Sequence, residues 1–168
     1  MKYKDCGAAL KAGRLAKGLT RTAVNTLTGI SYASIYGYEN WGREPTFGYM
    51  VLMCDLYDIA LNDIANTVRP ETHHRDRHTK SISGKLSEQD TTLGAVLRAA
   101  RESKRLTTRA VESITGISYV SITRYEIRGT MPLFTAAVLM CDLYDIYIDD
   151  LANILRRNGI TKRPSRHD

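Results

Sequence analysis

Two stretches of the chain decide its fold. Residues 19–39 read LTRTAVNTLTGISYASIYGYE, and residues 106–126 read LTTRAVESITGISYVSITRYE. The offset between them is 87 residues, and the same offset aligns residues 7–68 with residues 94–155 without a gap (94 − 7 = 87). About half of the aligned positions are identical, including the segment VLMCDLYDI. A repeat of this length is longer than most solenoid units, which span ~20–50 residues, so the sequence predicts two domains of the same fold.

Each copy shows the pattern of short helices and no alternation typical of strands. In the first copy, apolar residues at helical spacing predict a helix over Ala8–Lys17, which Gly18 ends. Further helices are predicted at Arg21–Thr28, Tyr32–Glu39, Thr46–Tyr57 and Asn62–Asn66. Thr20 and Ser31 are the N-cap candidates, with Thr107 and Ser118 in the second copy. The predicted fold class is therefore all-α.

The turn between the second and third helices is the most specific feature of each copy. Gly29, like Gly116 in the second copy, is expected to take the positive φ that a tight turn between two helices needs. The apolar residues around the turn fall where buried contacts would hold the two helices together, at Val24, Ile30, Ile35 and Tyr38.

With these landmarks in order, each copy resembles the lambda-repressor-like (Cro/cI, XRE-type) helix-turn-helix family, whose pattern reads roughly LTQxxLAxxxGVSxxxISxxExG. The resemblance covers nearly the whole of both repeats. It implies two tandem five-helix domains that bind double-stranded DNA. The copies depart from the pattern at its glutamine, replaced by Arg21 and Thr108, and at its small residue, replaced by Asn25 and Glu112.

The boundaries of the repeat predict four segments. Residues 1–68 and 93–155 are expected to form the two helix-turn-helix domains. Residues 69–92 lack apolar periodicity and are expected to form a flexible polar linker, and residues 156–168 a basic tail. The linker also contains His73, His74 and His78, and a solvated linker is favoured over a metal site.

Charge is divided along each copy. The net charge is +6, yet the two repeats are nearly neutral. Within each repeat the basic residues lie at or before Arg43 and Arg128, and only acidic residues follow. This pattern favours one face turned toward a polyanion and another turned away from it. The alternative is that the pattern is chance, copied once by the duplication.

The resemblance assigns residues to DNA contacts, because in this family the third helix enters the major groove. The implied base-contacting residues are Tyr32, Ala33, Ser34, Tyr36 and Gly37, and Tyr119, Val120, Ser121, Thr123 and Arg124. The implied phosphate-contacting residues are Arg21, Arg43, Arg109 and Arg128. Arg124 can read guanine through two hydrogen bonds, and Gly37 lacks that contact. The alternatives are packing roles for the tyrosines and a solvated Arg124.

Leucine pairs on the fourth helix of each copy predict an interface. They lie four residues apart, on one helix face, at positions where the family usually has lysine and a small residue: Leu52, Leu56, Leu139 and Leu143. The sister domain is the nearest candidate partner and a homodimer through helix four is the second. A larger core than the family norm is the alternative.

These observations predict a sequence-specific transcriptional regulator of phage, plasmid or bacterial type, most simply a repressor that binds an asymmetric operator as a covalent pseudo-dimer. A DNA-bending or recombination accessory factor and an autoregulating antitoxin are the alternatives. No enzyme, cofactor or metal site is expected, because no catalytic group pattern appears. Cys6, Cys54 and Cys141 are expected as core thiols. A cytoplasmic location without membrane attachment is expected, since no secretory signal or long apolar run appears.

Overall fold

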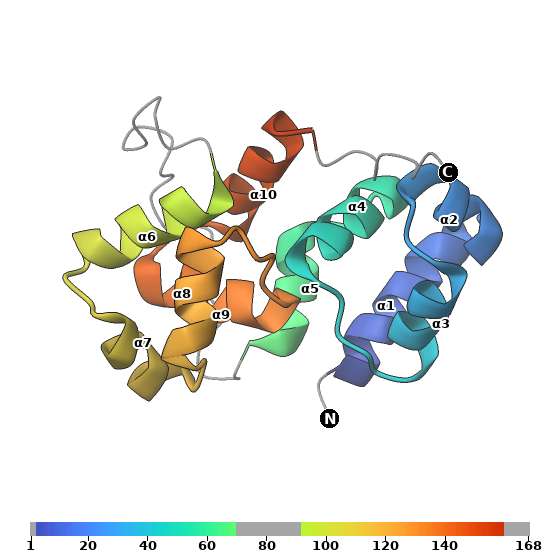
Figure 1. Ribbon diagram of the computed structural model, residues 1–168. Coiled ribbons are helices and arrows are strands. Elements are labelled where there is room, and N and C mark those ends of the chain that lie inside the picture. Colours follow the sequence, from blue (N-terminus) through green and yellow to red (C-terminus); the bar gives the residue numbers. More distant parts are fainter. Residues whose placement is uncertain (1–2, 70–91, 160–168) are drawn as a thin grey trace.

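The structure is a computed structural model that describes residues 3–69 and 92–159. Within these two ranges the chain forms ten helices and no strand, which confirms the all-α prediction (Figure 1). The first copy contains α1 (Tyr3–Ala16), α2 (Arg21–Thr28), α3 (Tyr32–Asn40), α4 (Phe47–Tyr57) and α5 (Leu61–Val68). The second contains α6 (Leu93–Ser103), α7 (Thr108–Thr115), α8 (Tyr119–Ile127), α9 (Phe134–Tyr144) and α10 (Ile148–Arg157).

The helix-turn-helix unit forms at the predicted positions because its end signals are local. The Thr20 hydroxyl accepts a hydrogen bond from the Ala23 N–H at 3.1 Å, which caps α2. Gly29 ends α2 with a φ of 71°, and Ser31 caps α3 by accepting from the Ser34 N–H at 3.1 Å. The second copy repeats this arrangement with Thr107, Gly116 and Ser118.

The turn of the first copy has an additional side-chain hydrogen bond that the sequence pattern did not predict. The Asn25 side-chain amide donates to the Ile30 carbonyl oxygen at 2.8 Å. Asn25 stands where the family pattern has a small residue. Its departure from the pattern therefore serves the turn, since it satisfies a carbonyl between the two helices.

A glycine near the start of each copy lets its first helix approach its third. A Cβ atom on residue 7 would lie 2.5 Å from the Tyr38 carbonyl oxygen, and one on residue 94 would lie 2.6 Å from the Tyr125 carbonyl oxygen. Both distances are too short for any side chain. Gly7 and Gly94 therefore set the packing of α1 on α3 and of α6 on α8, a role that the sequence analysis did not assign.

The core follows the predicted pattern with one exception. Val24, Ile30 and Ile35 are fully buried, whereas Tyr38 is only half-buried and packs at the edge of the core. The three cysteines are buried in the core, as expected. Burial raises the pKa of the Cys6 thiol to about 12 and also raises the pKa of the Cys54 thiol, which disfavours the reactive thiolate at both positions.

The two copies pack directly against each other through α4, α5, α9 and α10, which lie in the middle of the molecule in Figure 1. The Phe47 N–H donates to the Pro132 carbonyl oxygen at 2.8 Å, and the Phe134 N–H donates to the Pro45 carbonyl oxygen at 3.1 Å. These two hydrogen bonds are equivalent under the repeat offset. The contact is thus nearly two-fold symmetric, like the isologous interface of a homodimer, but within one chain.

Two ion pairs extend the same symmetry. Arg69 pairs with Asp142 at 3.0 Å, and Arg156 pairs with Asp55 at 2.6 Å. The sequence predicts Arg69 in the linker and Arg156 in the tail, whereas the structure places both in the contact between the copies. Their partners come from the acidic part of each repeat, so some of the acidic residues that follow Arg43 and Arg128 bind the opposite copy.

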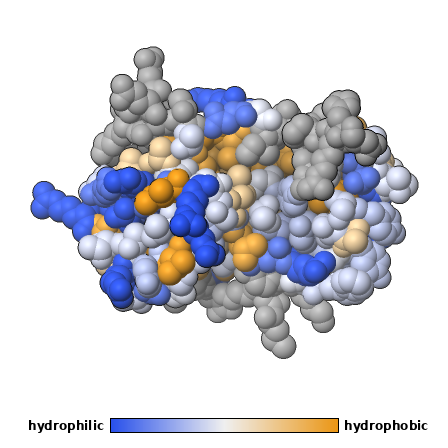
Figure 2. Space-filling view, viewed as in Figure 1, coloured by the Kyte–Doolittle hydropathy of each residue, from blue (hydrophilic) through white to orange (hydrophobic). Residues whose placement is uncertain are grey.

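The four leucines of the predicted interface lie on α4 and α9, which contact each other. All four are half-buried rather than exposed, and three of them pack against the core: Leu52, Leu56 and Leu143. Figure 2 shows hydrophobic surface near the middle of the visible face, between the two copies.

Candidate nucleic-acid interface

The first turns of α3 and α8 are exposed to solvent. Tyr32 is 52% exposed and Tyr119, its equivalent, is 40% exposed. Ala33 is also exposed, and Val120 is 42% exposed, although both carry apolar side chains. The next residue of each helix that points to the core is fully buried, Ile35 in α3 and Ile122 in α8. These buried residues hold the exposed turns against the core.

Serine pairs shape the start of both helices. The Ser31 hydroxyl lies 2.8 Å from the Ser34 hydroxyl, and the Ser118 hydroxyl lies 2.9 Å from the Ser121 hydroxyl. Each N-cap serine therefore accepts a hydrogen bond from a backbone N–H of the helix and also contacts the hydroxyl of the second serine. Ser34 and Ser121 are half-buried, and both remain near the exposed turn.

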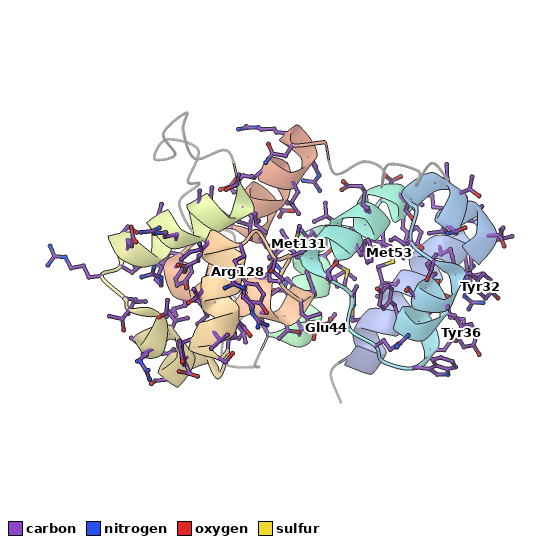
Figure 3. The ribbon with its side chains drawn as sticks, in the orientation of Figure 1. Tyr32, Tyr36, Glu44, Met53, Arg128 and Met131 are labelled. Carbon is purple, nitrogen blue, oxygen red and sulfur yellow. The ribbon has the colours of Figure 1, made fainter. Side chains whose placement is uncertain are left out.

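Arg21 is held in place on the first copy instead of extending into solvent. Its guanidinium pairs with Glu39 at 2.8 Å and lies 5.0 Å from the centre of the Tyr36 ring. Tyr36 in turn meets Trp41 edge to face, with ring centres 5.0 Å apart. Figure 3 shows Tyr32 and Tyr36 on the outer side of this copy. The arginine therefore has a fixed position at the start of α2 and keeps a small exposed fraction.

The second copy achieves a similar arrangement with different residues. The Arg109 guanidinium lies 4.6 Å from the centre of the Tyr119 ring. Thr123 replaces the second tyrosine of copy one, and its hydroxyl donates to the Tyr119 carbonyl oxygen at 2.8 Å. Arg124 and Arg128 are exposed. In the second copy the cation–π contact orients Tyr119, the first residue of α8, whereas in the first copy the equivalent kind of contact orients Tyr36.

Each copy contains a buried arginine–glutamate pair at the end of the helix that carries the exposed turn. Arg14 donates to both carboxylate oxygens of Glu39, at 2.6 and 2.9 Å, and to the Leu19 carbonyl oxygen at 2.8 Å. The hydrogen bond with Glu39 raises the pKa of Arg14. Arg101 and Glu126 repeat this pair at 2.8 Å.

These pairs join the first helix of each copy to the end of its third helix, α3 or α8, and to the loop before its second helix. They therefore fix the angle at which the exposed turn is presented. From the sequence, Glu39 is identified only as the end of the predicted third helix. The signal that could have found the pair is its retention in both copies at the same spacing.

Gly37 is not an open position. It is buried, because the side chain of Arg43 lies across it: a Cβ atom on residue 37 would lie 2.5 Å from the Arg43 Cδ. Arg124, the equivalent residue in the second copy, is exposed. Gly37, a predicted base-contacting residue, is therefore covered by the side chain of Arg43, a predicted phosphate-contacting residue.

Other kinds of site find no support in the described ranges. Residues 3–69 and 92–159 contain no group of histidine, cysteine and acidic side chains that could hold a metal ion. In the same ranges no helix combines the length and the apolar character needed to cross a bilayer. His73, His74 and His78 lie outside the described residues.

Comparison with known proteins supports the interpretation of the first copy. A helix-turn-helix family model matches residues 10–64, which run from within α1 to within α5. The match covers the first copy and does not extend to the second, which has the same helix order and caps. No curated protein and no solved structure matches the chain. The first copy is thus similar to a family of DNA-binding regulatory domains.

Proposed function

We propose that the protein is a sequence-specific, double-stranded DNA-binding transcriptional regulator, and that it represses by occupying an asymmetric operator as a covalent pseudo-dimer. The observation that carries the proposal is the exposed first turn of α3 and of α8, present twice in a molecule whose copies pack with near two-fold symmetry. In helix-turn-helix proteins this turn meets base edges, and paired domains bind two half-sites. The family match over residues 10–64 supports the same function.

The direct contact between the copies favours a fixed spacing of half-sites. Two domains joined only by a flexible tether would tolerate many spacings, because the tether supplies effective concentration without orientation. Here backbone hydrogen bonds and two ion pairs hold the copies together. A pseudo-dimer of this kind reads two major-groove segments at one separation, set by α4 and α9.

Differences between the copies favour two unequal half-sites. The aligned recognition helices differ at Ala33 and Val120, at Tyr36 and Thr123, and at Gly37 and Arg124. Val120 suits a thymine methyl group and Arg124 suits guanine. A protein that reads a perfect palindrome would need no such differences.

Selection of bound duplexes from a random pool tests the proposal. We expect one motif with two unlike halves, and affinity that falls with salt at a slope of roughly −0.9 per phosphate neutralised. Insertion of about five base pairs between the halves should rotate them by half a turn and reduce binding to that of one half-site. Equal affinity for selected and random duplexes would refute sequence-specific binding. Unchanged affinity after the insertion would refute the fixed pseudo-dimer.

A further inference from the structure

The recognition helices of the two copies carry a reciprocal exchange of arginine. Position 37 is glycine and position 43 is arginine in the first copy; the equivalent positions 124 and 130 are arginine and threonine in the second. Each copy thus has one arginine in this pair of positions, but in opposite places. From the sequence, Arg43 is expected to contact phosphate, and the first copy has no counterpart of Arg124.

The backbone joins the two positions in the same way in both copies. The Arg43 N–H donates to the Gly37 carbonyl oxygen at 3.2 Å, and the Thr130 N–H donates to the Arg124 carbonyl oxygen at 3.2 Å. The turn between them contains Gly42, with a φ of 62°, or Gly129, with a φ of 66°. Because the backbones match, the copies differ here only in their side chains.

The side chain of Arg43 occupies the place where a side chain on residue 37 would begin. Its Cδ lies 2.5 Å, its Cγ 3.4 Å and its Nη1 3.6 Å from the position of a Cβ on residue 37. The aliphatic stem therefore crosses the surface of α3 at Gly37, and the guanidinium stays against the same helix surface. A side chain at position 37 would displace this stem, so glycine allows Arg43 to lie across α3.

The Arg43 guanidinium is available for a ligand. Arg43 is exposed, and no carboxylate in the described part of the chain forms an ion pair with it. The neighbouring Glu44 accepts a hydrogen bond from the Thr135 N–H of the other copy at 2.6 Å. By contrast, Arg21 on the same copy is already paired with Glu39.

We propose that Arg43 is a base-reading residue, the counterpart in the first copy of Arg124 in the second. Its side chain reaches the recognition surface from the turn after α3 through the space left by Gly37. A guanidinium has the two parallel donors that match guanine O6 and N7, so the preferred partner is a guanine in the half-site of the first copy. This inference rests on the proposed function and names a specificity residue of the same surface.

The test compares Arg43→Ala with Arg124→Ala on the duplex selected by the wild-type protein and on its single base-pair variants. We expect each substitution to relax preference at one base pair, each in a different half-site, by roughly 5- to 150-fold. Arg43→Lys should relax the same base pair while it keeps the salt slope, because lysine retains the charge without the fork. Unfolding midpoints show whether each variant is folded. If Arg43→Ala does not fold, Arg43→Lys tests the loss of base preference in its place.

An exchange variant gives the matched control. Gly37→Arg combined with Arg43→Thr installs the arrangement of the second copy in the first, and should restore the preference that Arg43→Ala loses. If Arg43→Ala weakens all sequences alike, or the exchange restores nothing, Arg43 does not read a base. In that outcome Arg124→Ala still relaxes one base pair and the proposed function stands. A wild-type protein without any base preference would instead refute the proposed function itself.

Discussion

The N-termini of α4 and α9 occupy equivalent places in the two copies but are capped differently. α4 is capped within its own copy, where the Thr46 hydroxyl accepts from the Tyr49 N–H at 3.4 Å. α9 has Leu133 at this position and no cap of its own; Glu44 of the first copy accepts from the Thr135 N–H at 2.6 Å instead. Figure 3 shows Glu44 and Met131, its equivalent, near the middle of the molecule.

The residues around the two caps have diverged to fit each other. Met131 packs over Gly48 at the start of α4, with its terminal methyl carbon 3.5 Å from where a Cβ would lie. Two first copies paired together would each bring a glutamate to a helix that is already capped. Two second copies would leave both α9 helices without a side-chain cap. These contacts favour the pairing of unlike copies, so we expect pairing within one chain to be preferred over a homodimer.

The largest effect on stability is expected when the glutamate of the buried ion pair is removed, and this effect should be larger in the first copy than in the second. Glu39 is bound by two arginines, Arg14 and Arg21, and its side chain is 1% exposed. Glu39→Ala leaves the Arg14 charge buried without its partner and should lower the free energy of unfolding by about 3–5 kcal/mol. Glu126→Ala should cost less, because Arg101 is more exposed and lies 3.6 Å from a second carboxylate, Glu102.

Urea unfolding of both variants measures this difference, provided that the m-values stay equal to that of the wild-type protein. Equal losses for Glu39→Ala and Glu126→Ala would contradict the view that the first copy depends more on its pair.

A smaller effect is expected at the two ion pairs between the copies. The Arg69 side chain is 3% exposed and also donates to Asn62 and Asn66, at 2.8 and 2.6 Å. Arg69→Ala leaves Asp142 in a partly buried place and should cost about 2–4 kcal/mol. The symmetric Arg156, whose side chain is 36% exposed, should cost under about 1 kcal/mol when changed to alanine.

Thermal unfolding in low and high salt checks both the size and the origin of these losses. The Arg156 pair should weaken in high salt more than the Arg69 pair, since buried pairs are less screened. A larger loss for Arg156→Ala would reverse this ranking.

An effect smaller than that of Arg69→Ala is expected at the cap that one copy supplies to the other. Glu44→Ala removes the acceptor of the Thr135 N–H and a negative charge at the start of α9, and should cost about 0.5–2 kcal/mol. Adding Leu133→Thr should recover much of the loss, because α9 would then have the cap that Thr46 gives to α4. Denaturant midpoints of the single and double variants measure the recovery, and an unchanged midpoint in Glu44→Ala would show that the cap contributes nothing.

The parts of the fold that depend on neighbouring residues could be predicted from the sequence. The bounds of α2 and the N-caps Thr20 and Ser31 follow from signals within a few residues, and the exposed first turns of α3 and α8 follow from their position after the turn. By contrast, Glu44 and Thr135 are 91 residues apart, and nothing local to either indicates their contact.

The same distinction holds for the candidate site. The sequence places Gly37 and Arg43 as separate contact residues, because their relation appears only when the turn after α3 brings one side chain over the other. Arg69 and Arg156 were assigned to the linker and tail because their partners, Asp142 and Asp55, lie in the opposite repeat. Because the chain is duplicated, its fold could be predicted from the sequence. The contacts made by residues that differ between the copies appear only in the packed structure.

The pairing of the copies within one chain has a consequence for how the amount of protein relates to its action. When two separate chains must meet before they bind, and their association is weak, halving the number of chains leaves only about a quarter of the pairs. Here the two domains are joined by their own chain and packed through α4, α5, α9 and α10. Halving the number of chains therefore halves the number of paired units, and a single molecule in a cell is already a complete pair.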